Sequence, residues 1–101
     1  MDFKIILSPR AIQDLREIVR YISFDNPVRA ESFGRELIAK TRLLVSFPEM
    51  GRVVPEFDEL DIREIIHKSY RIVYRVRLEK RTIEVSRFWH GARGTPDLPA
   101  V

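Results

Sequence analysis

The sequence predicts an α+β fold in which a helical hairpin covers one face of an antiparallel sheet. A short apolar run at the start of the chain is followed by two proline-initiated amphipathic segments. Three later segments are rich in β-branched and aromatic residues, and one of them alternates apolar and basic residues. We therefore expect an N-terminal strand, an antiparallel helical hairpin and then a three-stranded antiparallel meander.

Composition limits the class of protein. The 101 residues are 45% hydrophobic and include no cysteine, which predicts one domain without disulfides or a thiolate zinc site. No apolar run approaches the roughly 20 residues that span a bilayer, so we expect a cytoplasmic protein without membrane contact. Residues 62–94 carry nine basic and three acidic residues, which predicts either an anionic partner or simply a solvated surface.

Two capping signals predict the helices. Ser8-Pro9 and Asn26-Pro27 each place a capping side chain before a proline, which is well tolerated in a first helical turn. Apolar residues then recur every three or four positions, which predicts helices over residues 9–24 and 27–47. Because their connection is short, the two helices should run antiparallel.

Four segments are predicted strands: residues 3–7, 62–67, 69–77 and 82–90. In the third, Tyr70, Ile72, Tyr74 and Val76 should face the helices, whereas Arg71, Arg75 and Arg77 should line an opposite face that stays partly open. The fourth loses its alternation, and a β-bulge near Ser86-Arg87 would return Phe88 to the core and redirect Arg87 and His90. We expect the domain to cover residues 1–94, residues 49–52 to form a turn or a single 3₁₀ turn, and residues 95–101 to form a flexible tail.

The predicted core joins the hairpin to the sheet. Its members are apolar residues on the inward faces of the predicted elements: Leu15, Ile18, Val19, Ile22, Phe33, Leu37, Leu44, Ile72, Tyr74, Ile83 and Val85.

Several kinds of catalytic site lack support in the sequence. There is no nucleophile elbow, no glycine-rich phosphate loop, and no spacing of the two histidines that suits a metal, so we expect neither metal nor cofactor. One basic and aromatic cluster remains as the candidate site, and its members are Arg71, Arg75, Arg87, Trp89, His90 and Arg93. Arginines hold phosphates bidentately, an imidazole transfers protons near neutral pH, and an indole stacks on unpaired bases. A structural role is the alternative for His90, at a strand end, and for Tyr70 and Tyr74, in the core.

The order of motifs resembles the RelE/ParE superfamily of toxins from type II toxin–antitoxin modules. The resemblance covers nearly the whole chain and rests on four motifs: Asn26-Pro27 with Ala30, Phe47-Pro48-Glu49-Met50-Gly51-Arg52, Ser69-Tyr70-Arg71-Ile72-Val73-Tyr74-Arg75-Val76, and His90-Gly91-Ala92-Arg93. It implies a small basic toxin that a cognate antitoxin neutralises in a heteromeric complex.

The resemblance implies one of two activities. ParE-like members poison DNA gyrase without being nucleases, whereas RelE-like members cut messenger RNA on the ribosome, which here would use Arg71, His90 and Arg93. RelE-like members carry a lysine pair before the Tyr-Arg motif and commonly a tyrosine in the C-terminal segment. Residues 61–67 hold no lysine and no tyrosine follows Arg93, so the Trp-His-Gly-Ala-Arg ending resembles the ParE-like branch more closely. A third interpretation is a toxin-derived protein that keeps only its binding function.

Overall fold

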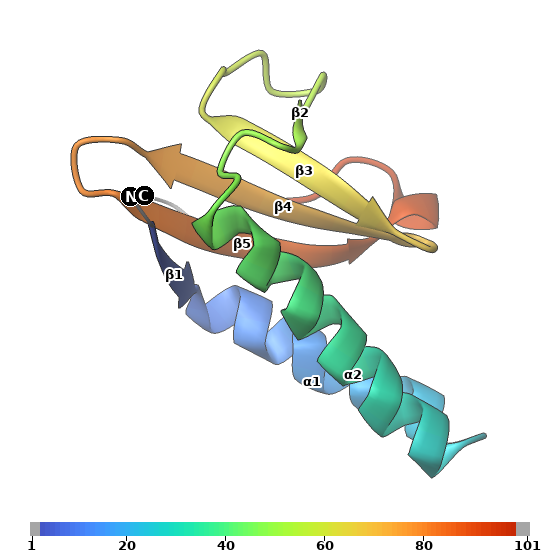
Figure 1. Cartoon of the computed structure of the whole chain (residues 1–101). Coiled ribbons are helices and arrows are strands. Elements are labelled where there is room, and N and C mark those ends of the chain that lie inside the picture. Colours follow the sequence, from blue (N-terminus) through green and yellow to red (C-terminus); the bar gives the residue numbers. More distant parts are fainter. Residues whose placement is uncertain (1–2, 99–101) are drawn as a thin grey trace.

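The computed structural model describes residues 3–98, and the elements follow the predicted α+β order (Figure 1). The first half contains β1 (Lys4–Leu7), α1 (Pro9–Ser23), α2 (Pro27–Arg42) and the 3₁₀ turn η1 (Leu43–Val45). The second half contains β2 (Arg52–Val53), β3 (Ile62–His67), β4 (Tyr70–Arg77), β5 (Thr82–His90) and the 3₁₀ turn η2 (Gly91–Arg93).

The sheet is larger than the predicted meander. Five strands lie in the order β1-β5-β4-β3-β2, with β1 parallel to β5 and every other pair antiparallel. The meander of β3, β4 and β5 is confirmed. The sequence missed β2, because two residues at the end of an expected turn carry no periodicity. It also missed that β1 pairs with β5, because local patterns do not identify a partner so far along the chain.

Both helix starts are confirmed by their caps. The Ser8 hydroxyl accepts a hydrogen bond from the Ala11 amide, and the Asn26 side chain accepts one from the Arg29 amide, each at 3.0 Å. The second helix is shorter than predicted, because α2 ends at Arg42 and the chain tightens into η1 before Pro48. The helices lie antiparallel against one face of the sheet (Figure 1).

The core between hairpin and sheet follows the prediction closely. One cluster centres on Leu37, Ile72 and Val85 and the other on Leu44 and Tyr74, and the predicted core residues other than Val19 belong to them or pack against them. Val19 instead lines a groove on the hairpin.

The predicted β-bulge is present. Val73 pairs with Arg87 whereas Tyr74 pairs with Val85, so Ser86 is the extra residue in β5. The insertion reverses the phase of the strand and buries Phe88 in the core. Arg87 is thereby turned toward the opposite face, beside Val73, as the sequence predicted.

The opposite face of the sheet is covered, and the expectation of a partly open basic face was therefore wrong. A third apolar cluster of Val54, Ile62 and Val73 lies there, packed against Phe57 and Leu98 from the flanking loops. The predicted tail is described as far as Leu98, and residues 99–101 lie outside the described residues. The division between a domain at 1–94 and a tail at 95–101 stays a prediction.

Candidate functional site

The candidate residues come from neighbouring elements, and all but Arg75, which pairs with Glu84, lie toward one end of the sheet. Arg71 and Arg75 lie on β4, Trp89 and His90 on β5, and Arg93 on η2. Cross-strand pairing sets Arg71 opposite Trp89, so these two side chains share the face away from the helices. His90 pairs with Tyr70 and therefore belongs to the helix side of the sheet.

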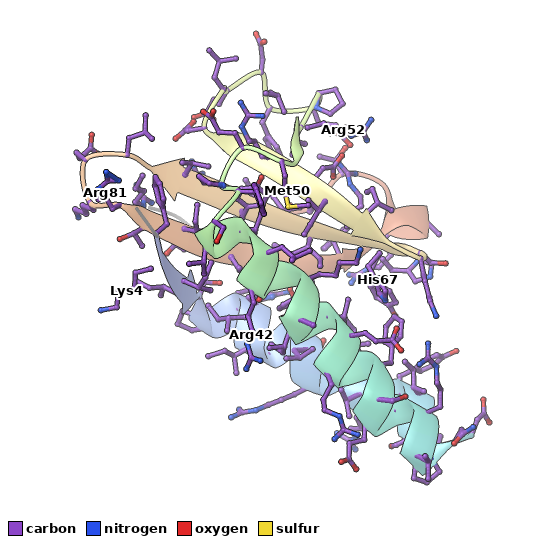
Figure 2. The ribbon with its side chains drawn as sticks, in the orientation of Figure 1. Lys4, Arg42, Met50, Arg52, His67 and Arg81 are labelled. Atoms are coloured by element: carbon purple, nitrogen blue, oxygen red, sulfur yellow. The ribbon has the colours of Figure 1, made fainter. Side chains whose placement is uncertain are left out.

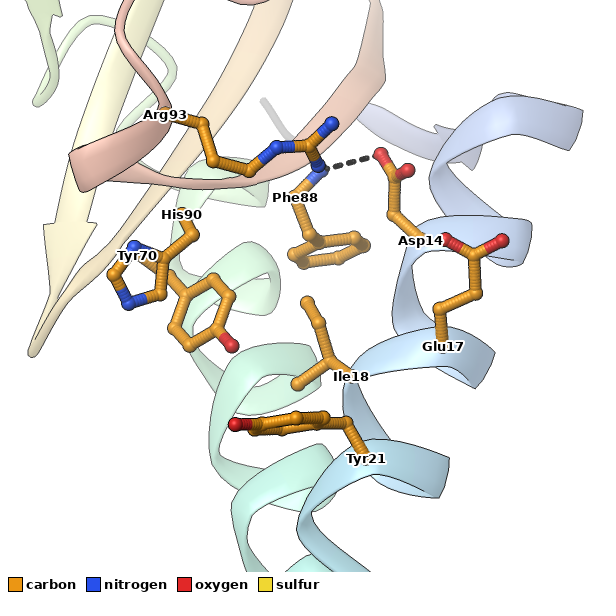
Figure 3. Close-up of a pocket in the computed structure, with 8 residues that line it drawn as sticks. All are labelled: Asp14, Glu17, Ile18, Tyr21, Tyr70, Phe88, His90 and Arg93. Carbon is orange, nitrogen blue, oxygen red and sulfur yellow. Dashed lines mark hydrogen bonds between the residues drawn. The ribbon is translucent and has the colours of Figure 1, made fainter.

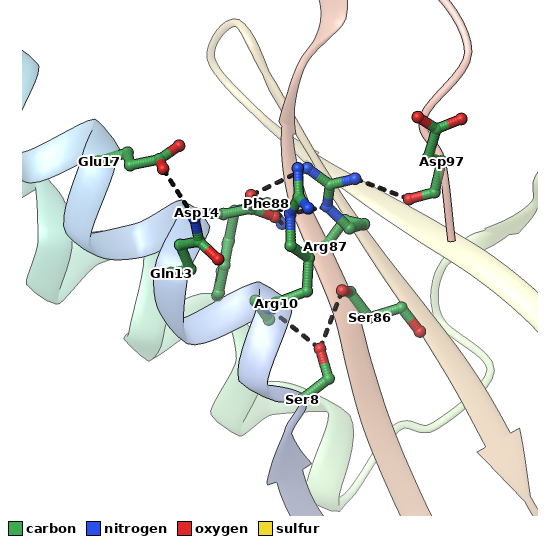
Figure 4. A network of polar contacts seen from close by, with 10 residues as sticks. Ser8, Arg10, Gln13, Asp14, Glu17, Ser86, Arg87, Phe88 and Asp97 are labelled. Atoms are coloured by element: carbon green, nitrogen blue, oxygen red, sulfur yellow. Dashed lines mark hydrogen bonds and ion pairs between the residues drawn. The ribbon is translucent and has the colours of Figure 1, made fainter. Parts of the chain in front are cut away.

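Arg87 is 1% exposed and is held by a carboxylate on α1 (Figure 4). Its Nε and Nη2 donate to the two oxygens of Asp14 at 2.7 and 2.9 Å, and Nη1 donates to the Asp97 carbonyl at 2.7 Å. Asp14 also accepts the Phe88 amide at 3.1 Å, just past the last β5 residue that pairs with β1. The Asp14 carboxylate thus accepts a hydrogen bond from a β5 backbone amide that β1 is too short to reach. Arg87 is held by Asp14 on one side and by the Asp97 carbonyl on the other.

Arg71, 8% exposed, is also neutralised inside the protein. Its Nε donates to Glu64 at 2.5 Å, and its two terminal nitrogens donate to the oxygens of Glu56 at 2.8 and 2.9 Å. The hydrogen bonds that Arg71 donates to Glu56 and Glu64 raise the pKa of Arg71, and the bonds that Glu56 accepts from Arg71 lower the pKa of Glu56. Glu64 is fully buried and also accepts from Arg52 at 2.6 Å, so one carboxylate joins two guanidinium groups.

These pairs explain why the basic face is not open. The sequence analysis predicted a row of unpaired arginines on this face, but Glu64 and Glu56 lie on the same face and pair with Arg71. A buried guanidinium requires such partners, because an unpaired charge inside a protein is strongly destabilising.

The ring of Trp89 is covered as well. It is 5% exposed, and the guanidinium groups of Arg87 and Arg93 lie 4.7 and 4.2 Å from its centroid. Its Nε1 donates to the Gly94 carbonyl at 2.9 Å. Arg93 itself is exposed, so a base can stack on Trp89 only after Arg93 moves away.

A first cavity of about 270 Å³ lies between α1 and the end of β5 (Figure 3). It is lined by aromatic and charged side chains: Asp14, Glu17, Ile18, Tyr21, Tyr70, Phe88, His90 and Arg93. The ring centroids of His90 and Tyr70 are 5.0 Å apart in an edge-on arrangement. The Nδ1 atom of His90 accepts a hydrogen bond from the Ala92 amide at 3.1 Å, and Nε2 has no hydrogen-bond partner among residues 3–98. Burial, and secondarily Tyr21, raises the pKa of Tyr70.

A second cavity, about 490 Å³, lies at the end of the sheet beside the turn between β3 and β4. Basic side chains and backbone dominate its lining: Arg52, Ile66, Lys68, Ser69, Tyr70, Arg71, His90, Gly91 and Ala92. We call it the basic cavity. The structure brings Arg71 and His90 together here and His90 and Arg93 together in the first cavity, whereas none of the described cavities contains all three.

A third hollow of about 540 Å³ runs along the helical hairpin, and we call it the hairpin groove. Its floor is apolar and its rim is charged: Leu15, Val19, Gly34, Ile38 and Ala39, with Glu31, Arg35 and Arg42. A Cβ atom added to Gly34 would lie only 3.0 Å from Val19, so the absence of a side chain at this position lets α1 and α2 pack closely.

One contact ties the hairpin to the outer strands. His67 at the end of β3 lies beside α2 (Figure 2), and its Nε2 is 2.9 Å from a Glu36 oxygen. Arg29 also donates a hydrogen bond to Glu36. The bond with Arg29 has the largest effect and the bond with His67 the next, and together they lower the pKa of Glu36 to about 2.

Sequence reasoning missed the acidic partners Asp14, Glu56 and Glu64. Two of them carried a signal, because Asp14 lies between the buried positions Ala11 and Ile18 of α1, and Glu64 follows inward-facing Ile62 by two residues. A carboxylate on an otherwise apolar face is the pattern of a buried ion pair. Glu56 gave no such signal, because it lies in a loop without periodicity.

Two kinds of site are not found in the described part of the chain. Among residues 3–98, no group of three histidine or acidic side chains is placed to hold a metal ion. The same residues include no helix long and apolar enough to cross a membrane.

Solved structures share this fold. A chain of the chromosomal ParDE toxin–antitoxin system from P. aeruginosa matches with a TM-score of 0.72 and 16% identity, over 87% of this chain and 95% of that one. A chain of the RelBE2 toxin–antitoxin complex from Mycobacterium tuberculosis matches with a TM-score of 0.60 and 18% identity, over 89% of this chain and 99% of that one. A mutant of the E. coli toxin RelE in the free state matches with a TM-score of 0.61 and 18% identity, over 93% of this chain and 88% of that one.

Sequence comparison identifies the family. No curated protein sequence matches the chain. The family model described as the ParE toxin of the type II toxin–antitoxin system parDE matches residues 5–94, which is most of the sequence. The matched range includes both helices and, apart from Lys4 of β1, all the strands, and the Asn-Pro, Tyr-Arg and His-Gly-Ala-Arg motifs lie within it. The chain therefore belongs to the ParE toxin family of the RelE/ParE superfamily, and it is the toxin of a type II toxin–antitoxin system.

Proposed function

We propose that this toxin acts by binding DNA gyrase and inhibiting it, and that it is not a ribonuclease. The observation that carries the proposal is the double neutralisation of Arg71. Its guanidinium donates hydrogen bonds to Glu56, Glu64 and the Gly94 carbonyl, so it is not available to stabilise a reacting phosphate.

The chemistry of RNA cleavage supports the same choice. A base for the 2′-hydroxyl, a stabilising group for the phosphorane and an acid for the leaving oxygen must lie together. In this protein His90 is the imidazole near the candidate site, and Arg71 and Arg93 line different cavities around it. Binding requires no such assembly, and exposed Arg93 and half-buried Arg75 remain available for contact. Gyrase acts in the bacterial cytoplasm, which we therefore propose as the site of action.

Two assays on purified protein test the proposal. We expect concentration-dependent loss of gyrase supercoiling, or trapped cleaved DNA, and no effect on translation in a cell extract. Arg93→Ala should weaken inhibition because it removes an exposed cation, whereas Arg35→Ala, which removes an exposed cation from α2, serves as the matched control. Codon-periodic cuts in messenger RNA that disappear in His90→Ala would replace this proposal with the ribonuclease. Normal growth on expression without antitoxin would favour an inactive binding protein.

We further propose that the cognate antitoxin lays an amphipathic helix in the hairpin groove. The groove combines an apolar floor with a rim that carries Arg35 and Arg42, which suits a helix with apolar anchors and acidic flanks. Charge should speed association and buried anchors should slow dissociation. Ala39→Glu, in the groove, should accelerate dissociation, whereas Val28→Glu, near the turn of the hairpin, should not. Association rates that are unchanged between low and high salt would exclude the electrostatic part.

A further inference from the structure

Three large apolar side chains are exposed around the tip of the helical hairpin. Tyr21, Phe24 and Val28 are 75%, 77% and 80% exposed, so most of their apolar surface faces water. Tyr21 and Phe24 form a strip along one side of α1, because the backbone of Phe24 is still helical after Ser23. A large exposed apolar strip of this kind indicates a surface that another protein covers.

The first cavity, between α1 and the end of β5, opens beside this strip. Ile18 and Tyr21 form its α1 side, and Tyr70 and Phe88 contribute from the sheet (Figure 3). Its volume of about 270 Å³ is sufficient for a phenyl ring, since an apolar cavity of roughly 150 Å³ already binds benzene. Phe24 of the same chain does not fill it, because that side chain is exposed.

An antiparallel register relates Phe24 to this cavity. When α1 of a second copy packs against α1 with a twofold axis at Tyr21, residues equally far before and after Tyr21 lie opposite each other. Phe24 follows Tyr21 by three residues and Ile18 precedes it by three, so Phe24 of each copy meets the cavity of the other.

The charges beside the strip fit the same register. Arg20 and Asp25 are both exposed, and neither has an ion-pair partner among residues 3–98. A twofold axis at Tyr21 brings Arg20 of each copy within reach of Asp25 of the other. The surface is therefore complementary to itself in charge as well as in shape.

We propose that two copies of this protein associate through α1 as an antiparallel pair, and that Phe24 of each copy occupies the first cavity of the other. A second copy is favoured over an unrelated protein because the ring and the cavity lie on one helix at the spacing that a twofold axis requires. The antitoxin helix proposed above is compatible with this pair, because Leu15 and Val19 line the hairpin groove on another side of α1. The proposal does not depend on gyrase, so either can fail alone.

Sedimentation equilibrium of the purified protein over a range of concentrations tests the pairing. The contact surface is small, so we expect a dissociation constant of about 1–100 µM. Phe24→Ser should raise this constant at least about tenfold, as the loss of a buried aromatic anchor does. Leu78→Ser is the matched control and should change it less than about twofold. Leu78 is 66% exposed but lies in the turn between β4 and β5, away from α1.

Cysteine cross-linking tests the register. The sequence has no cysteine, so a single introduced thiol can pair only with its counterpart in a second copy. Tyr21→Cys places two thiols at the twofold axis and should give a disulfide-linked dimer under mild oxidation, whereas Leu78→Cys should not. Adding Phe24→Ser to Tyr21→Cys should slow this cross-linking.

Three results would overturn the proposal. They are a wild-type protein that stays monomeric up to about 1 mM, a dimer that Phe24→Ser does not weaken, and equal cross-linking of Tyr21→Cys and Leu78→Cys. A monomer whose Phe24→Ser variant no longer inhibits gyrase would assign the strip to gyrase instead. Circular dichroism of each variant checks that these exposed substitutions leave the fold intact.

Discussion

Removing the carboxylate of Asp14 should destabilise the protein severely. Asp14→Ala leaves Arg87, which is 1% exposed, without its ionic partner, and breaking a buried pair in this way costs about 3–5 kcal/mol. The Phe88 amide also loses its acceptor, which adds about 1 kcal/mol. Small domains are stable by only about 5–15 kcal/mol, so the loss is a large part of the total.

Urea denaturation followed by circular dichroism measures the loss, and a double variant tests its cause. Asp14→Ala combined with Arg87→Met removes the stranded charge and should recover more than about 1 kcal/mol of the single variant's deficit. Glu17→Ala, on the exposed side of α1, should stay within about 0.5 kcal/mol of the wild type. A cost below about 1 kcal/mol for Asp14→Ala, or a double variant no more stable than the single one, would refute the ion-pair argument.

Three other perturbations have defined outcomes. Leu37 is fully buried, so Leu37→Ala should cost about 2–5 kcal/mol in urea melts, and a loss no greater than that of exposed Leu78→Ala would contradict its place in the core. Gly51→Ala would place a Cβ atom 2.5 Å from a β3 carbonyl and 2.7 Å from the Tyr74 hydroxyl, so the melting temperature should fall sharply; an unchanged value would show that this approach is not tight. The pKa of Glu36 is lowered from 4.5 to about 2, so its contribution is present above pH 4.5 and is lost as the pH falls toward 2. Melting temperatures of Glu36→Gln and the wild type should therefore differ at neutral pH and converge near pH 2, and a constant difference would exclude this linkage.

Local signals in the sequence predicted the helices and the meander. Ser8-Pro9 and Asn26-Pro27 are followed directly by the segments that they cap, so the information lies within a few residues. The bulge at Ser86 was predictable for a similar reason, because the phase of β5 changes within the strand itself.

Long-range partners were beyond the same reasoning. Asp14 and Arg87 lie on α1 and β5, and neither residue indicates the other in a single sequence. The charge of this sheet face was therefore misjudged. In the sequence Arg71 and Arg87 look like free cations, but in the fold they pair with Glu64 and Asp14. Whether the candidate residues are available to a partner depends on their ion pairs, which only the fold supplies.

The parallel pairing of β1 with β5 determines when the protein can complete its fold. Lys4 to Leu7 are synthesised before both helices and the rest of the sheet, whereas their partners, Thr82 to Val85, belong to the last strand of the domain. Because synthesis proceeds from the N-terminus, β1 has no strand partner until the helices and the other strands have emerged. Such a high contact order slows folding, since a long loop must close before its contacts form. A chain released before Thr82 lacks the strand that lies between β1 and β4, so synthesis that stops early yields no complete toxin.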